Sequence, residues 1–232
     1  MYANNDNEVK TVEALLARVA ESHNRSDFST HLPDLEAIIS TLPQNSTTAS
    51  KAHLLLAVGY QNQSKPELTD RHLKLCENGP LFPVDKDFQS RTYNVRALWH
   101  YNQGDYVNSI STHLKALEIR EQGEDKVAIA QSCFNLGRNF ERLGENTRAL
   151  TYYQRATDIS VELGLQHKES LYRTGLAGVY QAMMRDEECM RENQRALKIA
   201  EEVNNERLIS VALNSIARLL YDQQKHEEAL SY

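Results

Sequence analysis

The stretch Ala130–Ala156 reads AQSCFNLGRNFERLGENTRALTYYQRA, and its spacing of apolar and small residues decides the fold. In its first half, apolar or small residues recur three or four positions apart from Cys133 to Phe140, which is the spacing of one helical face. Gly144 interrupts this pattern, and a second helical pattern begins with Ala149. The stretch therefore predicts two helices joined by a turn at Gly144, because glycine suits the left-handed conformation that ends many helices.

The same pattern returns every 40 residues along the chain. The copies of its core motif are Leu56-Ala57-x-x-Tyr60, Arg96-Ala97-x-x-His100, Leu136-Gly137-x-x-Phe140, Leu176-Ala177-x-x-Tyr180 and Ile216-Ala217-x-x-Leu220. A second small residue keeps the same phase at Ala116, Ala156 and Ala196. A fixed period of this length predicts stacked helical repeats, in which each repeat packs only against its neighbours.

This order of apolar, small and aromatic positions resembles the tetratricopeptide repeat over residues 51–232. Cys133 takes the position where that family usually has Trp, and the period is longer than the usual length of about 34 residues. The resemblance implies an all-α fold, a right-handed superhelical solenoid of antiparallel helix pairs. Arrays of the HEAT or armadillo type have a similar period, but the small residues expected at the helix crossings favour the tetratricopeptide interpretation.

We expect two parts in the chain. Residues 1–45 fit the period loosely and predict a divergent helical pair, with helices near 8–23 and 33–42, that caps the array. Residues 46–232 predict repeats that begin near 50, 90, 130, 170 and 210. The last predicted helix begins near His226, only a few residues before the sequence ends. Because so short a helix is marginal alone, we expect a longer native protein.

Composition narrows the classes of function. The formal net charge of −6 disfavours nucleic acid as a partner, because phosphate binding needs clustered Lys and Arg. No run approaches the roughly 18 apolar residues of a membrane span, and the first residues lack a secretory signal. The three cysteines lack metal-ligand spacing. We therefore expect a cytoplasmic protein that needs no metal or cofactor and binds neither nucleic acid nor membranes.

Catalytic motifs are missing from the sequence. It has no phosphate loop, no Gly-x-Ser-x-Gly, no His-Glu-x-x-His and no Cys-x-x-Cys. His100 and His113 fall in predicted interior positions, where we favour two histidines in place of aromatic residues over a proton-sensitive pair. Trp99 is predicted to pack between repeats rather than to anchor a partner. We therefore expect no enzyme activity in this segment.

The first helix of each pair lines the concave face in the family that the chain resembles, which predicts a peptide-binding groove along these helices. Asn can both donate to and accept from a peptide backbone, and Arg can hold a carboxylate with two hydrogen bonds. The predicted groove residues are Arg91, Asn94, Tyr101, Gln131, Asn135, Arg138, Arg142, Thr174, Gln181, Asn214 and Arg218. Gly175 and Gly178 predict a close approach or a cavity on the same helix. Ordinary hydrated positions are the alternative interpretation.

The resemblance implies a module that binds a protein or peptide segment. We expect the N-terminal sensory or regulatory region of a larger bacterial signalling protein, such as a diguanylate cyclase with a Gly-Gly-Asp/Glu-Glu-Phe output domain or a sensor kinase. One alternative is a regulator that responds to peptide pheromones, although residues 1–45 show no basic recognition helix. Another is an assembly scaffold that forms a homodimer through its ends.

Overall fold

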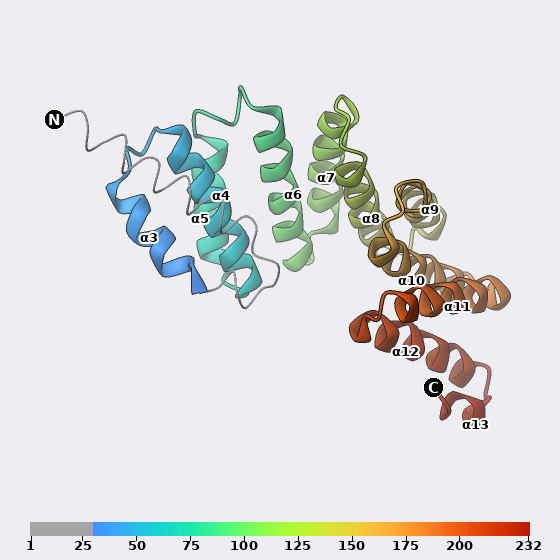
Figure 1. Ribbon diagram of the computed structural model, residues 1–232. Coiled ribbons are helices and arrows are strands. Elements are labelled where there is room, and N and C mark those ends of the chain that lie inside the picture. The colour runs from blue at the N-terminus through green and yellow to red at the C-terminus, as the bar shows by residue number, and fades with distance from the viewer. Residues whose placement is uncertain (1–29) are drawn as a thin grey trace. The chain divides into compact units, whose positions relative to one another are not determined.

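The computed structural model describes residues 30–232, and these residues form eleven α-helices and no β-strand (Figure 1). In chain order the helices are α3 (Leu32–Thr41), α4 (Thr47–Asn62), α5 (Pro66–Glu77), α6 (Lys86–Asn102), α7 (Tyr106–Glu121), α8 (Lys126–Arg142), α9 (Asn146–Glu162), α10 (Gln166–Ala182), α11 (Asp186–Glu202), α12 (Glu206–Asp222) and α13 (His226–Ala229). The helix expected near 33–42 is α3. The helix expected near 8–23 lies outside the described residues.

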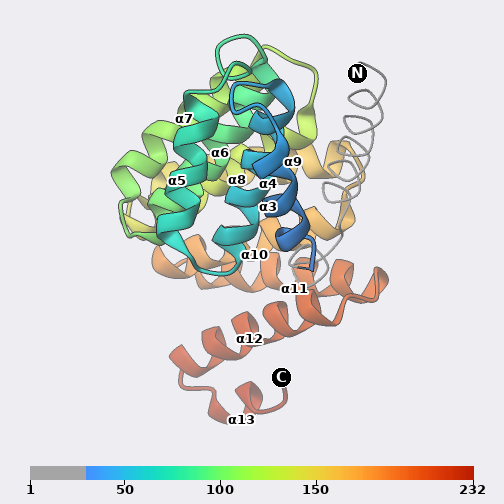
Figure 2. The ribbon, with the colours of Figure 1, turned by 90° about the vertical axis from the view of Figure 1, so that its left-hand side faces the viewer.

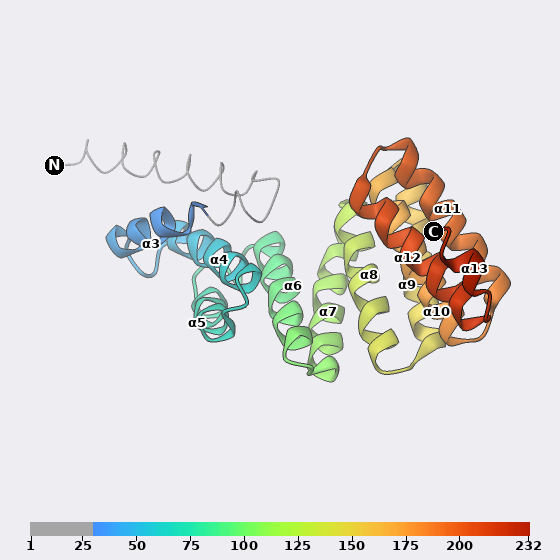
Figure 3. The same cartoon turned by 90° about the horizontal axis from the view of Figure 1, so that it is seen from below.

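The chain divides into two compact units between Ile119 and Arg120. In unit 1, α4 contacts α3, α5 and α6 (Figure 2). In unit 2, each helix from α8 to α12 contacts the next one along the chain (Figure 3). The predicted all-α fold of consecutive packed helix pairs is therefore confirmed.

The period of 40 residues is visible in the backbone of the turns within each helix pair. Left-handed residues lie at Ser64, Gly104, Gly144, Met184 and Gln224, with φ angles of 56°, 77°, 73°, 57° and 61°. Each of them is 40 positions from the next, and the left-handed turn predicted at Gly144 is confirmed. Residues other than glycine are strained in this conformation by about 1–2 kcal/mol, so the stacking of the helices fixes the turn even where the residue type opposes it.

The starts of the first helices follow the same period. The side chains of Asp85, Asp125 and Asn205 each accept a hydrogen bond from the backbone N–H three residues later. Such caps satisfy donors that the first turn of a helix leaves without partners. Leu165 holds the equivalent position before α10 and offers no side-chain cap.

Small residues at the helix crossings admit the side chains of the neighbouring helix. The ring of Tyr153 on α9 is almost fully buried and lies against Gly137 on α8 and Gly175 on α10. A Cβ atom added at Gly137 would approach the ring to 2.8 Å, and one added at Gly175 would approach it to 2.7 Å. The close approach expected at Gly175 is therefore explained by this ring. Gly178 is less crowded, because only the carboxylate of Glu141 comes within 3.3 Å of an added Cβ.

One repeat replaces an apolar core position by an ion-pair network. Arg96 stands where Leu136 and Leu176 stand in later repeats, and it is only 9% exposed. Its guanidinium donates two hydrogen bonds to Glu77, at 2.8 and 2.9 Å, and one to Asp70 at 2.5 Å. Charge-assisted bonds of this kind hold α6 against α5.

Trp99, His100 and His113 of the same repeat are all at least half-buried. Trp99 is half-buried and donates from Nε1 to the carbonyl of Pro66 at 3.0 Å, which confirms that it packs between repeats. His113 is fully buried. His100 is half-buried, and its Nδ1 lies 3.3 Å from Asp105 Oδ2.

Candidate functional site

In unit 2, the first helices of three successive pairs are α8, α10 and α12. They lie next to one another, and α10 contacts both α8 and α12. Their predicted groove residues define what we term the inner-helix face. These residues are Gln131, Asn135, Arg138, Arg142, Thr174, Gln181, Asn214 and Arg218.

Hydrogen bonds join neighbouring helices across this face. Arg218 donates from Nε and Nη2 to Gln181 Oε1 at 3.1 and 2.8 Å, and Gln181 Nε2 donates to Asp222 Oδ2 at 2.6 Å. Lys168 on α10 donates to Gln131 Oε1 on α8 at 3.5 Å. The partners are 37 or 41 residues apart, close to one period. The structure therefore brings Gln181 and Arg218 together, as members of one continuous surface.

The predicted residues differ in how far they reach solvent. Arg142, Asn214 and Arg218 are exposed, whereas Gln131, Arg138, Thr174 and Gln181 are half-buried. Asn135 is only 4% exposed, and its Oδ1 accepts a hydrogen bond from Gln131 Nε2 at 3.4 Å. In this structure Asn135 supports the face from beneath, and its more exposed neighbours form the surface.

Apolar side chains also reach solvent on the same helices. Leu171 on α10 is 36% exposed, and Val211 and Tyr221 on α12 are 41% and 63% exposed. Leu171 and Val211 follow Gln131 at intervals of 40 residues, and Tyr221 follows Gln181 at the same interval. Leu171 and Val211 were not predicted as part of the groove, although the repeat phase carried that signal. They add apolar contact area to the polar groups of the inner-helix face.

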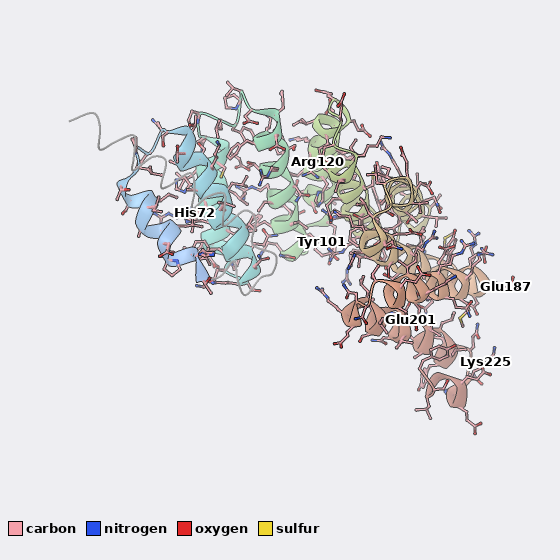
Figure 4. The ribbon with its side chains drawn as sticks, viewed as in Figure 1. His72, Tyr101, Arg120, Glu187, Glu201 and Lys225 are labelled. Atoms are coloured by element: carbon pink, nitrogen blue, oxygen red, sulfur yellow. The ribbon has the colours of Figure 1, made fainter. Side chains whose placement is uncertain are left out.

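The three remaining predicted residues lie on α6 and belong to unit 1. Arg91 is exposed, with its Nη1 3.6 Å from Asp87 Oδ2. Asn94 and Tyr101 are half-buried, and Tyr101 is labelled in Figure 4. The ring of Tyr101 meets that of Tyr106 edge-on at 5.4 Å between centroids.

Burial shifts the pKa values of a lysine and two cysteines on the helices of unit 2. Burial lowers the pKa of Lys168, Asp125 opposes this effect, and Arg120 adds to it. Burial raises the pKa of both Cys133 and Cys189 to about 11, so both thiols stay protonated near neutral pH and lack the reactivity of a thiolate.

Residues 30–232 contain no cluster of three or more His, Cys, Asp or Glu side chains suited to hold a metal ion. None of the described helices combines the length and the apolar character that crossing a bilayer requires.

Comparison with known proteins identifies the repeat. The family model of the tetratricopeptide repeat matches residues 88–160. No curated protein of similar sequence is found. Among solved structures, a Signal Transduction ATPase with Numerous Domains protein with a tetratricopeptide repeat sensor, from Pyrococcus horikoshii, superimposes with a TM-score of 0.78 at 17% identity. The match covers 97% of this chain and 35% of that protein.

Two further structures share the fold. A Rap protein complexed with Competence and Sporulation Factor has a TM-score of 0.74 and 15% identity, over 95% of this chain and 63% of that protein. BtubC from P. vanneervenii has a TM-score of 0.66 and 16% identity, over 95% of this chain and 87% of that protein. At these identities the likeness establishes the fold, which is typical of modules that bind other proteins.

Proposed function

Because this chain contains tetratricopeptide repeats, we propose that the inner-helix face of α8, α10 and α12 binds an extended peptide segment of a partner protein. The observation that carries this proposal is the bridge of Arg218, Gln181 and Asp222 across α10 and α12. It holds a guanidinium, an amide and a carboxylate in fixed positions at a surface. Such groups can exchange hydrogen bonds with the main chain of a peptide.

The apolar residues beside this bridge provide the complementary part of the site. Leu171, Val211 and Tyr221 are exposed on the same helices. Exposed apolar and aromatic side chains that are surrounded by polar groups are typical anchor points at protein interfaces. A peptide with alternating polar and apolar side chains fits this combination best.

A peptide library displayed on phage tests the proposal. We expect the chain to select peptides whose affinity falls at least tenfold in the double variant Gln181→Ala with Arg218→Ala, since each lost hydrogen bond to a charged group is worth about 1.5–3 kcal/mol. The matched control is Gln154→Ala with Arg191→Ala, which removes the same residue types from exposed positions on α9 and α11. Selected peptides that bind the inner-face variant as tightly as the unchanged chain would refute the assignment.

We further propose that this binding module is the input region of a bacterial signalling protein, such as a diguanylate cyclase or a sensor kinase. The support is that the similar ATPase from Pyrococcus horikoshii carries a tetratricopeptide repeat sensor, and that the chain spans only 35% of its length. Reading the gene beyond the codon for Tyr232 tests this idea. A Gly-Gly-Asp/Glu-Glu-Phe domain or a histidine kinase core is the expected result, and a stop codon at that point would contradict it.

A further inference from the structure

Unit 1 contains a cavity of about 640 Å³ between α3, α4 and α5. This volume lies within the range of roughly 300–1,000 Å³ that is usual for small-molecule sites. Apolar side chains form one part of its wall: Ile39, Leu42, Ala49 and Leu75. Ionisable side chains form another part: His53, Glu67, Asp70, Arg71, His72 and Lys74. The cavity therefore offers an apolar lining beside a cluster of titratable groups.

Two histidines, His53 and His72, form a pair in the wall of this cavity. His72 is labelled in Figure 4. The Nδ1 atoms of His53 and His72 lie 2.9 Å apart, and the two residues are 8% and 9% exposed. A hydrogen bond between two such nitrogens needs one donor and one acceptor, so at least one of the imidazoles is neutral in this arrangement. The ring of His72 also stacks on that of Tyr60, 5.5 Å between centroids, which fixes its orientation.

The repeat does not require histidines at these two positions. Three periods later the equivalent residues are Arg173 and Glu192, and Arg173 Nη1 donates to Glu192 Oε2 at 2.6 Å. The separation along the chain is 19 residues in both pairs. The same two positions of the repeat therefore hold an ion pair in one repeat and two titratable imidazoles in the other. The histidines are a local feature of the cavity rather than a demand of the fold.

Among the residues that the structure describes, one cation in the cavity wall has no counter-ion. The carboxylate of Asp70 is held by Arg96 at 2.5 Å and by Lys74 at 2.7 Å. Arg71 is exposed at the cavity wall and forms no ion pair with any residue in the range 30–232. Glu67 is the other carboxylate in the wall, and it is exposed on the first turn of α5. Of the lining residues, α3 contributes no charged group, and α4 contributes only His53.

We propose that this cavity binds a small monocarboxylic acid with an apolar body, and that the histidine pair takes up a proton when the acid binds. The carboxylate would accept hydrogen bonds from the Arg71 guanidinium and from a protonated imidazole, and the apolar body would lie against Ile39 and Leu75. A transition metal ion is the less favoured occupant, because no third His, Cys, Asp or Glu ligand joins the pair within the described residues. This site is independent of the inner-helix face.

The direction of the proton linkage follows from the surroundings of the pair. Burial and the positive charge of Arg71 lower the pKa of His53. Burial, His53 and Arg71 together lower the pKa of His72 to about 4, so both rings are neutral near pH 7 in the free protein. A bound carboxylate favours the imidazolium and raises the pKa of the pair. Between the free and bound pKa values, affinity therefore falls by up to about tenfold for each unit of rising pH.

Isothermal titration of the 232-residue chain with 3-phenylpropionate tests the proposal, with the neutral 3-phenylpropanamide as the matched ligand. We expect the acid to bind more tightly at pH 5.5 than at pH 7.5, with proton uptake that is detected by comparing buffers of different ionisation enthalpy. Arg71→Gln should weaken binding about ten- to a hundredfold, the usual effect of losing a charged hydrogen-bond donor. Lys51→Gln is the control, because it removes a cation from an exposed position of α4 that does not line the cavity.

A second variant separates the histidines from the fold. The double substitution His53→Arg with His72→Glu installs the ion pair of Arg173 and Glu192 at the equivalent positions, so we expect an intact helical circular dichroism spectrum and no proton uptake on ligand addition. Equal binding of acid and amide would overturn the proposal, as would the absence of binding at every pH or unchanged affinity in Arg71→Gln. Because Arg71 is exposed, that variant stays interpretable even if the double variant unfolds.

Discussion

Gly175 and Gly178 lie one turn apart on α10, and alanine should change the stability of the protein in opposite directions at the two positions. In a helix interior, replacing Gly by Ala stabilises by about 1 kcal/mol. At Gly178 an added Cβ meets only the end of the exposed, flexible Glu141 side chain, at 3.3 Å. The Glu141 carboxylate accepts a hydrogen bond from Tyr153 through its other oxygen, but it needs to shift by only a few tenths of an ångström. Gly178→Ala should therefore raise the free energy of unfolding by about 0.5–1 kcal/mol.

At Gly175 the same substitution meets a side chain that has no room to move. The added Cβ would lie 2.7 Å from Cε1 of Tyr153, and the same ring is nearly as close to Gly137. The Tyr153 side chain is only 1% exposed. Overpacking of this kind costs about 1–3 kcal/mol, which outweighs the gain in helix propensity. Gly175→Ala should therefore be less stable than Gly178→Ala by about 1–3 kcal/mol.

Urea denaturation followed by circular dichroism at 222 nm measures these differences, and Tyr153 provides the internal control. In a Tyr153→Leu background the ring is gone, so Gly175→Ala should become stabilising. In a Tyr153→Phe background the ring remains and the hydroxyl bond to Glu141, 2.7 Å long, is lost, so Gly175→Ala should stay destabilising. A double-mutant cycle isolates the coupling. If Gly175→Ala stabilises the protein equally in all three backgrounds, the packing argument is wrong.

Three further predictions concern single residues. Met184 is 90% exposed with a φ of 57°, so Met184→Gly should raise the free energy of unfolding in urea by about 1 kcal/mol, whereas Met184→Ala, which keeps the Cβ atom, should not. The hydroxyl of Tyr172 is buried and has no hydrogen-bond partner among the described residues, so Tyr172→Phe should leave the melting temperature unchanged or raise it, because an unsatisfied buried group carries a desolvation penalty; a clear fall would reveal a partner. Burial opposes ionisation of Asp70, but hydrogen bonds from Lys74 and Arg96 outweigh it and lower its pKa. The stability that this carboxylate contributes is therefore present above its unfolded pKa of about 3.9 and lost as the pH falls through the folded value. Melting curves of Asp70→Asn should accordingly show a weaker dependence on pH in the acid range than those of the unchanged chain.

The turns show how far the sequence alone could lead. The residue type at Gly104 and Gly144 predicts left-handed turns. Ser64, Met184 and Gln224 adopt the same conformation without any local signal, and only the period of 40 residues indicates them. The period was therefore the stronger predictor of backbone conformation, since packing between neighbouring repeats imposes the turn on whatever residue holds that position.

The partners of side chains were harder to predict from the sequence than the backbone conformation. Arg96 is a polar residue in an apolar position of the repeat, but its partners Asp70 and Glu77 lie 26 and 19 residues away, and nothing in the sequence selects them from the other acidic residues. Asn135 has the residue type of a binding group, yet it is buried. The helical pattern assigns a side chain to one face of the helix but does not locate it within that face. Buried and exposed positions can share a face, so the pattern could not separate Asn135 from its exposed neighbours.

Variation within a repeat phase separates the residues that build the array from those that can serve recognition. At the crossing positions the residue must be small, as at Gly137 and Ala177, because the neighbouring helix leaves no room for a larger side chain. One turn further along α8, α10 and α12 the equivalent residues are Glu141, Gln181 and Tyr221, which share neither size nor charge. Stacking places them side by side without constraining their chemistry, so each repeat can present a different group to the same partner. Under the proposed peptide binding, exchanging Gln181 for the residue of another repeat should alter which peptide is selected while leaving the fold intact.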